Sequence, residues 1–309
     1  MSILFYCDFL ESKKWINNFK DKFKNERFYT VSDKPNYHQI EYAIIWNLPN
    51  KILKKLTNLK IIFLLGSGVD RVLNSSNYKN TPILRLEDPL MGYRMSYYVH
   101  SQILQYQLNL KYYQMGQLNK IWCEEKNPIM NNELKIGILG VGYLGTYVGS
   151  YLSKLNYNVV GYKKTPKILS NSFPMLTGNK LKDFILGNDI IISILPSTKE
   201  TLNFIDKKFL TIMKKKSLLI NVGRGKTIDE KALINHLKKN KNFHVSLDVF
   251  KKEPLKKNSP LWRLPNVTIT PHVACITPLK SALEQIYNRF VLYKKTGKIK
   301  SDVNIKRGY

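Results

Sequence analysis

The sequence predicts an α/β protein made of two parallel α/β units. Short apolar runs alternate with helical patterns through the first third of the chain, and a second alternation starts at Leu134. The length of 309 residues exceeds one typical domain, so two domains are expected. No apolar run approaches the roughly 18 residues of a membrane helix, and the N-terminus lacks a secretory signal pattern, so neither is expected.

The first unit is expected to contain strands at residues 3–6, 43–46, 59–65 and 83–86. The spacing of apolar residues predicts helices at 14–23 and near 51–56. A long pattern without Gly or Pro then predicts one helix over 95–114. A polar stretch at 119–133 separates that helix from the second unit.

The second unit is expected to contain strands at 135–139, 158–162, 190–195, 217–222, 245–250 and 267–270, with helices at 143–155 and 229–239. A last helix is predicted at 279–295. In an open parallel sheet, ligands bind beyond the carboxyl ends of the strands. The residues that follow these strands are therefore the candidates for a binding site.

Composition gives little support for a specific nucleic-acid partner. The chain has 50 basic and 22 acidic residues, a formal net charge of +28. Its lysines are scattered and the usual nucleic-acid motifs are missing, so compositional drift explains the charge better than a dedicated RNA or DNA surface. Weak binding of polyanions at low salt is still expected. Cys7, Cys123 and Cys275 are unclustered, which predicts reduced thiols and no metal site.

The first candidate is the glycine loop Gly140-Val-Gly142-Tyr143-Leu144-Gly145, which follows a predicted strand and opens a predicted helix. Its glycines suit a tight turn, a close approach of backbone to pyrophosphate, and close helix–strand packing. The helix N-terminus offers N–H groups and a positive dipole end to phosphate. This context predicts dinucleotide binding, with a glycine-rich turn that binds nothing as the alternative.

The end of the next predicted strand bears on the choice of dinucleotide. An NAD site usually places an acid there for the ribose hydroxyls, whereas this chain has Lys163, Lys164 and Thr165. Two ammonium groups and a hydroxyl would attract a 2′-phosphate. NADPH is therefore the expected cofactor, and NADH is the alternative if these are merely two more lysines in a lysine-rich chain.

Three side chains after later strands form a candidate catalytic group. Arg224 lies between two glycines in Asn221-Val-Gly-Arg-Gly225, where a guanidinium can clamp a carboxylate through two hydrogen bonds. Glu253 could fix the tautomer of the His272 imidazole and stabilise its charged form. Each residue taken singly could be structural, but their shared setting favours catalysis. The other histidines lack such partners and are interpreted as structural or surface residues: His38, His100, His236 and His244.

Together these motifs resemble the D-isomer-specific 2-hydroxyacid dehydrogenase family, and most closely its glyoxylate/hydroxypyruvate reductase A branch. The resemblance spans essentially the whole chain. Its marks include Leu65-Gly-Ser-Gly-Val-Asp70, Ile136-Gly-Ile-Leu-Gly-Val-Gly-Tyr-Leu-Gly145, Leu195-Pro-Ser-Thr198, Asn221-Val-Gly-Arg-Gly225, Leu247-Asp-Val-Phe250 and Val267-Thr-Ile-Thr-Pro-His-Val-Ala274.

The resemblance implies two doubly wound parallel-sheet domains, a Rossmann cofactor domain and a flavodoxin-like substrate domain. Residues 1–96 would form the first part of the substrate-binding domain, and residues 97–275 the NAD(P)-binding domain. Residues 276–309 would form a C-terminal helix and tail that return to the substrate domain. The family resemblance also implies a homodimer located in the cytoplasm.

The resemblance further implies roles for individual residues. Arg224 would bind the carboxylate of a small 2-oxo acid, with His272 as proton donor and Glu253 as its partner. Asp248 would contact the nicotinamide side of the cofactor. Further cofactor contacts are implied for Gly140, Gly142, Tyr143, Leu144, Gly145, Lys163, Lys164, Thr165, Leu195 and Pro196. Substrate contacts are implied for Trp46, Gly66, Ser67 and Gly68.

The implied reaction is NADPH-dependent reduction of glyoxylate to glycolate and of hydroxypyruvate to D-glycerate. Two alternatives stay open: an NAD-linked dehydrogenase for another D-2-hydroxy acid, and a dinucleotide-responsive binding protein without turnover. Asn47, Leu48 and Cys275 depart from the family pattern. They lie outside the catalytic group and could alter substrate preference.

Overall fold

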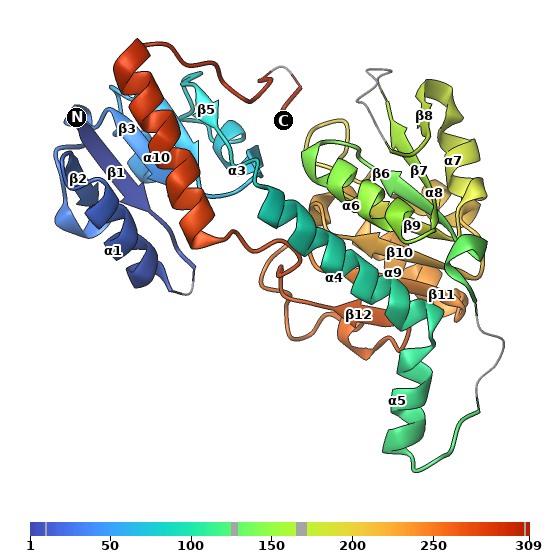
Figure 1. The fold of residues 1–309 in the computed structure, drawn as a ribbon. Coiled ribbons are helices and arrows are strands. Elements are labelled where there is room, and N and C mark those ends of the chain that lie inside the picture. The colour runs from blue at the N-terminus through green and yellow to red at the C-terminus, as the bar shows by residue number, and fades with distance from the viewer. Residues whose placement is uncertain (10, 125–128, 165–171, 306) are drawn as a thin grey trace. The chain divides into compact units, whose positions relative to one another are not determined.

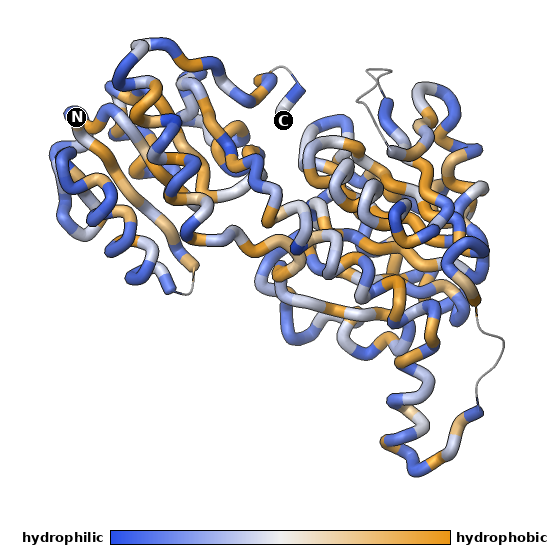
Figure 2. Tube along the Cα trace, viewed as in Figure 1, coloured by the Kyte–Doolittle hydropathy of each residue, from blue (hydrophilic) through white to orange (hydrophobic). Residues whose placement is uncertain are grey.

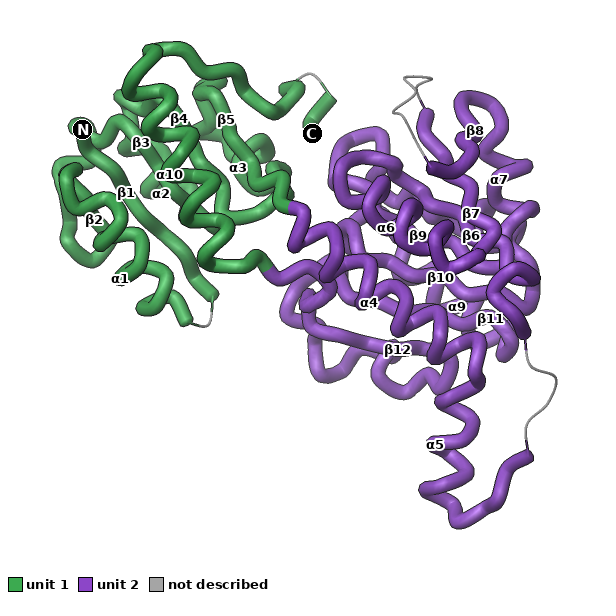
Figure 3. Tube along the Cα trace, viewed as in Figure 1, with its two compact units in different colours: residues 1–88, 277–309 green, residues 89–276 purple. Residues whose placement is uncertain are grey.

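The computed structural model describes residues 1–9, 11–124, 129–164, 172–305 and 307–309, and the chain divides into two compact units (Figure 3). Unit 1 comprises Met1–Asp88 and Thr277–Tyr309, and unit 2 comprises Pro89–Ile276. Unit 1 is therefore assembled from both ends of the chain. Unit 2 begins with helix α4 (Pro89–Gln107), which contains residue 96.

Unit 1 is built on a five-stranded parallel sheet with the order β2-β1-β3-β4-β5. The strands are β1 (Ser2–Tyr6), β2 (Arg27–Thr30), β3 (Tyr42–Ile45), β4 (Ile61–Leu64) and β5 (Ile83–Leu84). The central strands are buried apolar runs (orange in Figure 2), as parallel strands covered on both faces require. This strand order confirms the flavodoxin-like class.

Helices from both chain ends cover this sheet (Figure 1): α1 (Ser12–Lys22), α2 (Asn50–Leu53), α3 (Asp70–Leu73) and α10 (Leu279–Thr296). The ring of Phe290 on α10 lies edge-on to Phe23 and to Tyr42, with both pairs of ring centroids 5.2 Å apart. The tail after α10 is held by an ion pair between Arg289 and Asp302. The last helix of the chain is thus an integral part of the first unit.

Unit 2 is built on a seven-stranded parallel sheet with the order β12-β11-β10-β9-β6-β7-β8. The strands are β6 (Lys135–Leu139), β7 (Asn158–Lys163), β8 (Met175–Thr177), β9 (Ile190–Ser193), β10 (Ser217–Asn221), β11 (Phe243–Leu247) and β12 (Val267–Ile269). The order reverses between β6 and β9, which makes this a Rossmann-type sheet. In such sheets the reversal point marks the ligand crevice.

The remaining helices of unit 2 are α5 (Leu110–Leu118), α6 (Tyr143–Lys154), α7 (Leu181–Gly187), α8 (Lys207–Ile212) and α9 (Glu230–Lys239). Helix α4 packs against α6. Short 3₁₀ turns occur at Val31–Asp33, Tyr37–Gln39, Asn131–Glu133, Gly178–Lys180, Gly225–Thr227 and Pro260–Arg263. None of the helices in the described ranges combines the length and apolar character needed to cross a membrane.

Some details of the predicted elements were wrong. The single helix predicted over residues 95–114 is in fact two helices, α4 and α5, because Asn109 takes a left-handed conformation with φ 52° between them. Asn tolerates that conformation better than most residues. The edge strands β2 and β8 were not predicted, since each is short and only partly buried and so lacks a clear apolar pattern.

Candidate active site

The glycine loop lies between β6 and α6, at the reversal point of the sheet. Gly140 has φ 100°, a conformation that strongly favours glycine. A Cβ added to Gly145 would come 2.3 Å from the carbonyl oxygen of Gly140, so only glycine lets α6 pack this closely onto the loop. The turn and the close packing expected from the sequence are therefore both present.

The loop also fits a dinucleotide. A Cβ added to Gly142 would meet no atom within 4 Å, so open space lies beside the backbone where α6 begins. Tyr143 and Leu144 form the first turn of that helix, whose N–H groups have no intrahelical acceptor. Open space beside a helix N-terminus is the arrangement that binds a pyrophosphate.

The two described basic residues at the end of β7 differ in their surroundings. Lys163 is the last residue of the strand and is half-buried. Lys164 is exposed, and its Nζ lies 3.0 Å from Oε2 of Glu200 in an ion pair on the surface. The charge of Lys164 is thus shared with an acid on the surface. The contact of either lysine with a 2′-phosphate stays a prediction. Thr165 lies outside the described residues.

The loops that follow β6, β9, β10 and β11 are in direct contact. A Cβ on Gly140 would lie 3.0 Å from the carbonyl group of Ile194, and one on Gly223 would lie 2.6 Å from the oxygen of Leu195. A Cβ on Gly225 would overlap the backbone of Phe250. Glycines thus let four loops pack backbone to backbone, and the predicted residues Leu195 and Pro196 lie in the second of these loops.

Arg224 lies in the loop after β10, with its backbone fixed on both sides. Its carbonyl oxygen accepts hydrogen bonds from Asn221 Nδ2 at 3.2 Å and from Thr227 Oγ1 at 2.6 Å. Its Nη1 donates to the carbonyl oxygen of Gly223 at 2.9 Å. Arg224 is half-buried as a residue, and its contact with a substrate carboxylate stays a prediction.

His272 and Glu253 form a pair at the ends of β12 and β11. The Nδ1 of His272 lies 2.9 Å from Oε2 of Glu253, and Oε1 of the same carboxylate accepts the backbone N–H of Phe250 at 3.0 Å. Their side chains are 37% and 27% exposed, which leaves the pair accessible to a ligand. Because Nδ1 faces Glu253, Nε2 is the ring atom available to a substrate.

Asp248, predicted to contact the cofactor, is buried in the loop of His272. Its Oδ1 accepts hydrogen bonds from Thr270 Oγ1 at 2.6 Å and from the N–H of Val273 at 2.8 Å. Its Oδ2 accepts the N–H of Ala274 at 2.9 Å. The carboxylate therefore fixes the backbone around His272, and its predicted contact with the cofactor stays a prediction.

The predicted substrate-binding residues lie in unit 1, at the carboxyl ends of β3 and β4. A Cβ on Gly66 would lie 2.3 Å from Cζ3 of Trp46, so the indole packs directly on the glycine backbone. Ser67 Oγ donates to the carbonyl oxygen of Leu86 at 2.8 Å, and Gly68 follows in the same loop. The structure thus brings these four residues together within their own unit.

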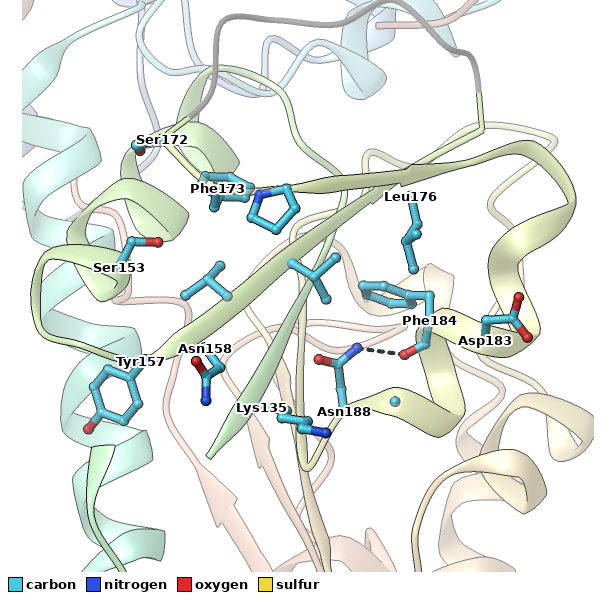
Figure 4. Close-up of a pocket in the computed structure, with 14 residues that line it drawn as sticks. Lys135, Ser153, Tyr157, Asn158, Ser172, Phe173, Leu176, Asp183, Phe184 and Asn188 are labelled. Atoms are coloured by element: carbon cyan, nitrogen blue, oxygen red, sulfur yellow. Dashed lines mark hydrogen bonds between the residues drawn. The ribbon is translucent and has the colours of Figure 1, made fainter. Parts of the chain in front are cut away.

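A described cavity of about 420 Å³ lies elsewhere in unit 2 (Figure 4). It borders Lys135 and Asn158, the first residues of β6 and β7, and an apolar wall that includes Phe173 and Phe184. Its lining contains none of the predicted site residues. It belongs to the amino ends of the strands, whereas the glycine loop follows their carboxyl ends.

Fold and site together define an α/β protein of the dinucleotide-binding class, in which a His–Glu pair and an arginine follow strands of the Rossmann-type sheet. Residues 101–274 match the family model described as D-isomer specific 2-hydroxyacid dehydrogenase, NAD binding domain. The chain is 32% identical to a glyoxylate/hydroxypyruvate reductase A of Photorhabdus laumondii, over the full length of both.

Two solved structures of similar fold carry related names. One is a D-isomer specific 2-hydroxyacid dehydrogenase from Xanthobacter autotrophicus in complex with NADPH and MES (28% identity, 100% and 99% of the chains covered, TM-score 0.91). Another is a probable 2-hydroxyacid dehydrogenase from Rhizobium etli in complex with NADP, HEPES and L(+)-tartaric acid (26% identity, the same coverage, TM-score 0.88). The chain belongs to the D-isomer specific 2-hydroxyacid dehydrogenase family.

Proposed function

We propose that the chain is an NADPH-dependent reductase of small 2-oxo acids, which converts glyoxylate to glycolate and hydroxypyruvate to D-glycerate. The observation that carries this proposal is the 2.9 Å pair of His272 and Glu253. It adjoins the loop of Arg224, at the same sheet edge as the glycine loop. The name of the Photorhabdus laumondii relative supports these two substrates.

The side chains divide the chemistry between them. When bound, the nicotinamide supplies the hydride that the carbonyl carbon receives. His272 donates the proton from Nε2 to the carbonyl oxygen as negative charge develops there, which yields the 2-hydroxy acid. Glu253 accepts the hydrogen bond of the Nδ1–H and so fixes the orientation of the imidazole. The neutral ring then recovers a proton from solvent.

Arg224 is proposed to orient the substrate. A guanidinium can bind the carboxylate of a 2-oxo acid through two parallel hydrogen bonds, which presents the carbonyl group in one orientation. Its positive charge also stabilises the developing alkoxide, an effect that is commonly worth about 3 kcal/mol for a well-placed donor. Trp46, Gly66, Ser67 and Gly68 are proposed as further substrate contacts.

NADPH is proposed as the preferred cofactor because Lys163 ends β7 where an NAD site usually has an acid. The bound NADPH and NADP of the Xanthobacter and Rhizobium structures support this preference. The ion pair of Lys164 with Glu200 limits the contribution of the second lysine. Comparing NADPH with NADH in the same assay decides between the two cofactors.

A homodimer is proposed from an apolar surface on unit 2. Exposed side chains follow α4, α5 and the segment after α5: Tyr97 at 59%, Met115 at 56%, Leu118 at 76%, Ile121 at 61% and Trp122 at 93%. An exposed apolar group of this size typically marks a protein interface, and a second copy is the simplest partner. The cytoplasm is proposed as the location because the thiols are expected to be reduced.

Light scattering tests the dimer. The purified chain should have about twice the 36.0 kDa mass of one copy, and Trp122→Lys should lower that mass toward one copy at equal concentration. An exposed tryptophan outside this surface, Trp262, supplies the control change Trp262→Lys, which should leave the mass unaltered. A wild-type protein that runs as one copy at micromolar concentration would contradict the proposal.

The reductase itself is tested by following NADPH oxidation with glyoxylate, hydroxypyruvate and pyruvate in parallel. Oxidation should be fastest with the first two substrates and slower with NADH than with NADPH. Turnover with NADH alone would favour an NAD-linked dehydrogenase. If neither cofactor is oxidised with any of the three acids while NADPH still binds, the non-catalytic alternative replaces the reductase.

A further inference from the structure

One face of α4 is tied to the strands that carry the catalytic loop. Three polar side chains follow each other at helical spacing and meet hydroxyl groups on β11 and β12 or just after β12. The contacts are Tyr98 Oη to Thr270 Oγ1 at 2.6 Å, Ser246 Oγ to Gln102 Oε1 at 2.9 Å, and Thr268 Oγ1 to Gln105 Oε1 at 3.0 Å. Helix α4 therefore holds the edge strand β12 by directed hydrogen bonds.

The contact of Tyr98 differs from the other two because its partner, the Thr270 hydroxyl, makes a second hydrogen bond to Asp248. Thr270 Oγ1 donates its one proton to Oδ1 of Asp248 at 2.6 Å. The same oxygen must then accept the proton of the Tyr98 phenol. Burial raises the pKa of Tyr98, which keeps that phenol protonated as a donor. The result is a chain of donors with one direction, from Tyr98 to Thr270 to Asp248.

Asp248 passes this constraint to the backbone of the histidine loop. Its carboxylate accepts the N–H groups of Val273 and Ala274 at 2.8 and 2.9 Å, and its carbonyl oxygen accepts the N–H of His272 at 2.8 Å. His272 has φ 57°, a conformation that costs energy for a residue with a side chain. Such a conformation persists only where the surrounding contacts over-determine it.

We propose that Tyr98 is a positioning residue for the proton donor His272, acting through Thr270 and Asp248. The phenol fixes the Thr270 hydroxyl so that its proton points at Asp248, and Asp248 then holds the backbone N–H groups of His272 and of the two residues that follow it. Without the phenol, the hydroxyl can rotate to other acceptors and the loop has one constraint fewer. This inference rests on the proton-donor role of His272 in the proposed function.

Tyr98→Phe tests the inference, since it removes one oxygen atom and keeps the ring. In the NADPH oxidation assay with glyoxylate, kcat should fall roughly tenfold, because small misplacements of a catalytic group are costly. The KM for glyoxylate and the Kd for NADPH should stay within about twofold, since the Tyr98 phenol contacts Thr270 and is not among the proposed ligand contacts. The solvent deuterium isotope effect on kcat should rise as proton transfer becomes slower.

Tyr106→Phe is the matched control. Tyr106 lies on the same helix, partly buried, with its ring edge-on to His244 at 5.5 Å between centroids. It makes no hydrogen bond to Asp248 or Thr270 among the described contacts. Loss of the Tyr106 hydroxyl should leave kcat and the solvent isotope effect within about twofold of the wild type. An equal fall of kcat in both variants would show a general packing effect and overturn the inference.

A second pair of variants, at two threonines that contact α4, tests the inference even if Tyr98→Phe is unstable. Thr270→Val should reproduce the fall of kcat, whereas Thr268→Val should not, although both threonines bond to α4. The double variant Tyr98→Phe/Thr270→Val should be no slower than Thr270→Val alone, since both act in one chain. The inference would be overturned if the fold losses of kcat in the two single variants multiply in the double variant. It would also be overturned if Thr270→Val keeps the wild-type kcat.

A failure of the proposed reductase function and a failure of the proposed role of Tyr98 give different results. If the wild type reduces none of the three acids, the proposed function fails and the role of Tyr98 falls with it. If the wild type is active and Tyr98→Phe matches it in kcat and isotope effect, only the inference about Tyr98 fails.

Discussion

At the scale of single residues, the proposed site requires that Arg224, Glu253 and His272 are placed by neighbours that the motifs do not include. The sequence pointed to these three because each follows a predicted strand. It gave no comparable signal for Tyr98, which lies within a helix and is linked to the site by Thr270. Thr270 itself could have been found, since it directly precedes Pro271 and His272 in the family motif.

His272→Ala should lower kcat by roughly two orders of magnitude or more, because the carbonyl oxygen loses its proton donor. The Kd for NADPH should stay nearly unchanged, which titration of the bound cofactor's fluorescence can measure. His38→Ala, the same change at an exposed histidine in unit 1, should retain wild-type turnover. Wild-type kcat in the His272 variant would remove it from the mechanism.

Lys163→Asp should lower the ratio of kcat/KM for NADPH to that for NADH by roughly tenfold or more, because an acid repels a 2′-phosphate and can accept ribose hydroxyls. Steady-state kinetics with both cofactors measure this ratio. Lys239→Asp makes the same charge change at the exposed end of α9 and should leave the ratio alone. An unchanged ratio in the Lys163 variant would refute the phosphate assignment.

At the scale of elements, most helices and strands could be predicted because buried parallel strands read as continuous apolar runs. The missed edge strands β2 and β8 lack that pattern. Several predicted strands ran past their true ends, for example 245–250 against Phe243–Leu247. Two of these extra residues are apolar and lie in a buried loop: Val249 is 2% exposed and Phe250 7%. Buried apolar loop residues that follow a strand therefore have the same sequence pattern as the strand itself.

The start of α6 gives a prediction that separates binding from folding. Gly142→Ala should weaken NADPH binding roughly tenfold or more, because its Cβ would enter the space beside the helix N-terminus that suits a pyrophosphate. The melting temperature should change little, since that Cβ meets no protein atom within 4 Å. Gly187→Ala, equally uncrowded at the end of α7, should leave both quantities unchanged. Unaltered NADPH affinity in Gly142→Ala would place the cofactor elsewhere.

At the scale of the whole molecule, several histidines couple stability to pH. Burial lowers the pKa of His100, His236 and His244. The unfolded chain therefore binds more protons than the folded chain as the pH falls through the ordinary histidine value of about 6.5. The free energy of unfolding should consequently decrease between about pH 7.5 and pH 5.5, before the carboxylates titrate.

Urea unfolding at both pH values measures this decrease. His244→Gln should reduce the difference between the two pH values, because its uncharged amide removes one of the titrating groups. His38→Gln, at an exposed site, should leave the difference close to that of the wild type. A difference that His244→Gln leaves intact would assign the pH dependence to other groups.

The discontinuity of unit 1 has a consequence for how the protein is made. Unit 2 is complete in sequence once residue 276 has left the ribosome, whereas unit 1 must wait for α10, which follows unit 2 in the chain. Until α10 has been made, the rings of Phe23 and Tyr42 lack their packing contacts with Phe290. Residues 1–88, although translated before unit 2, should therefore gain protease resistance after it. Stalled nascent chains of increasing length would reveal this order.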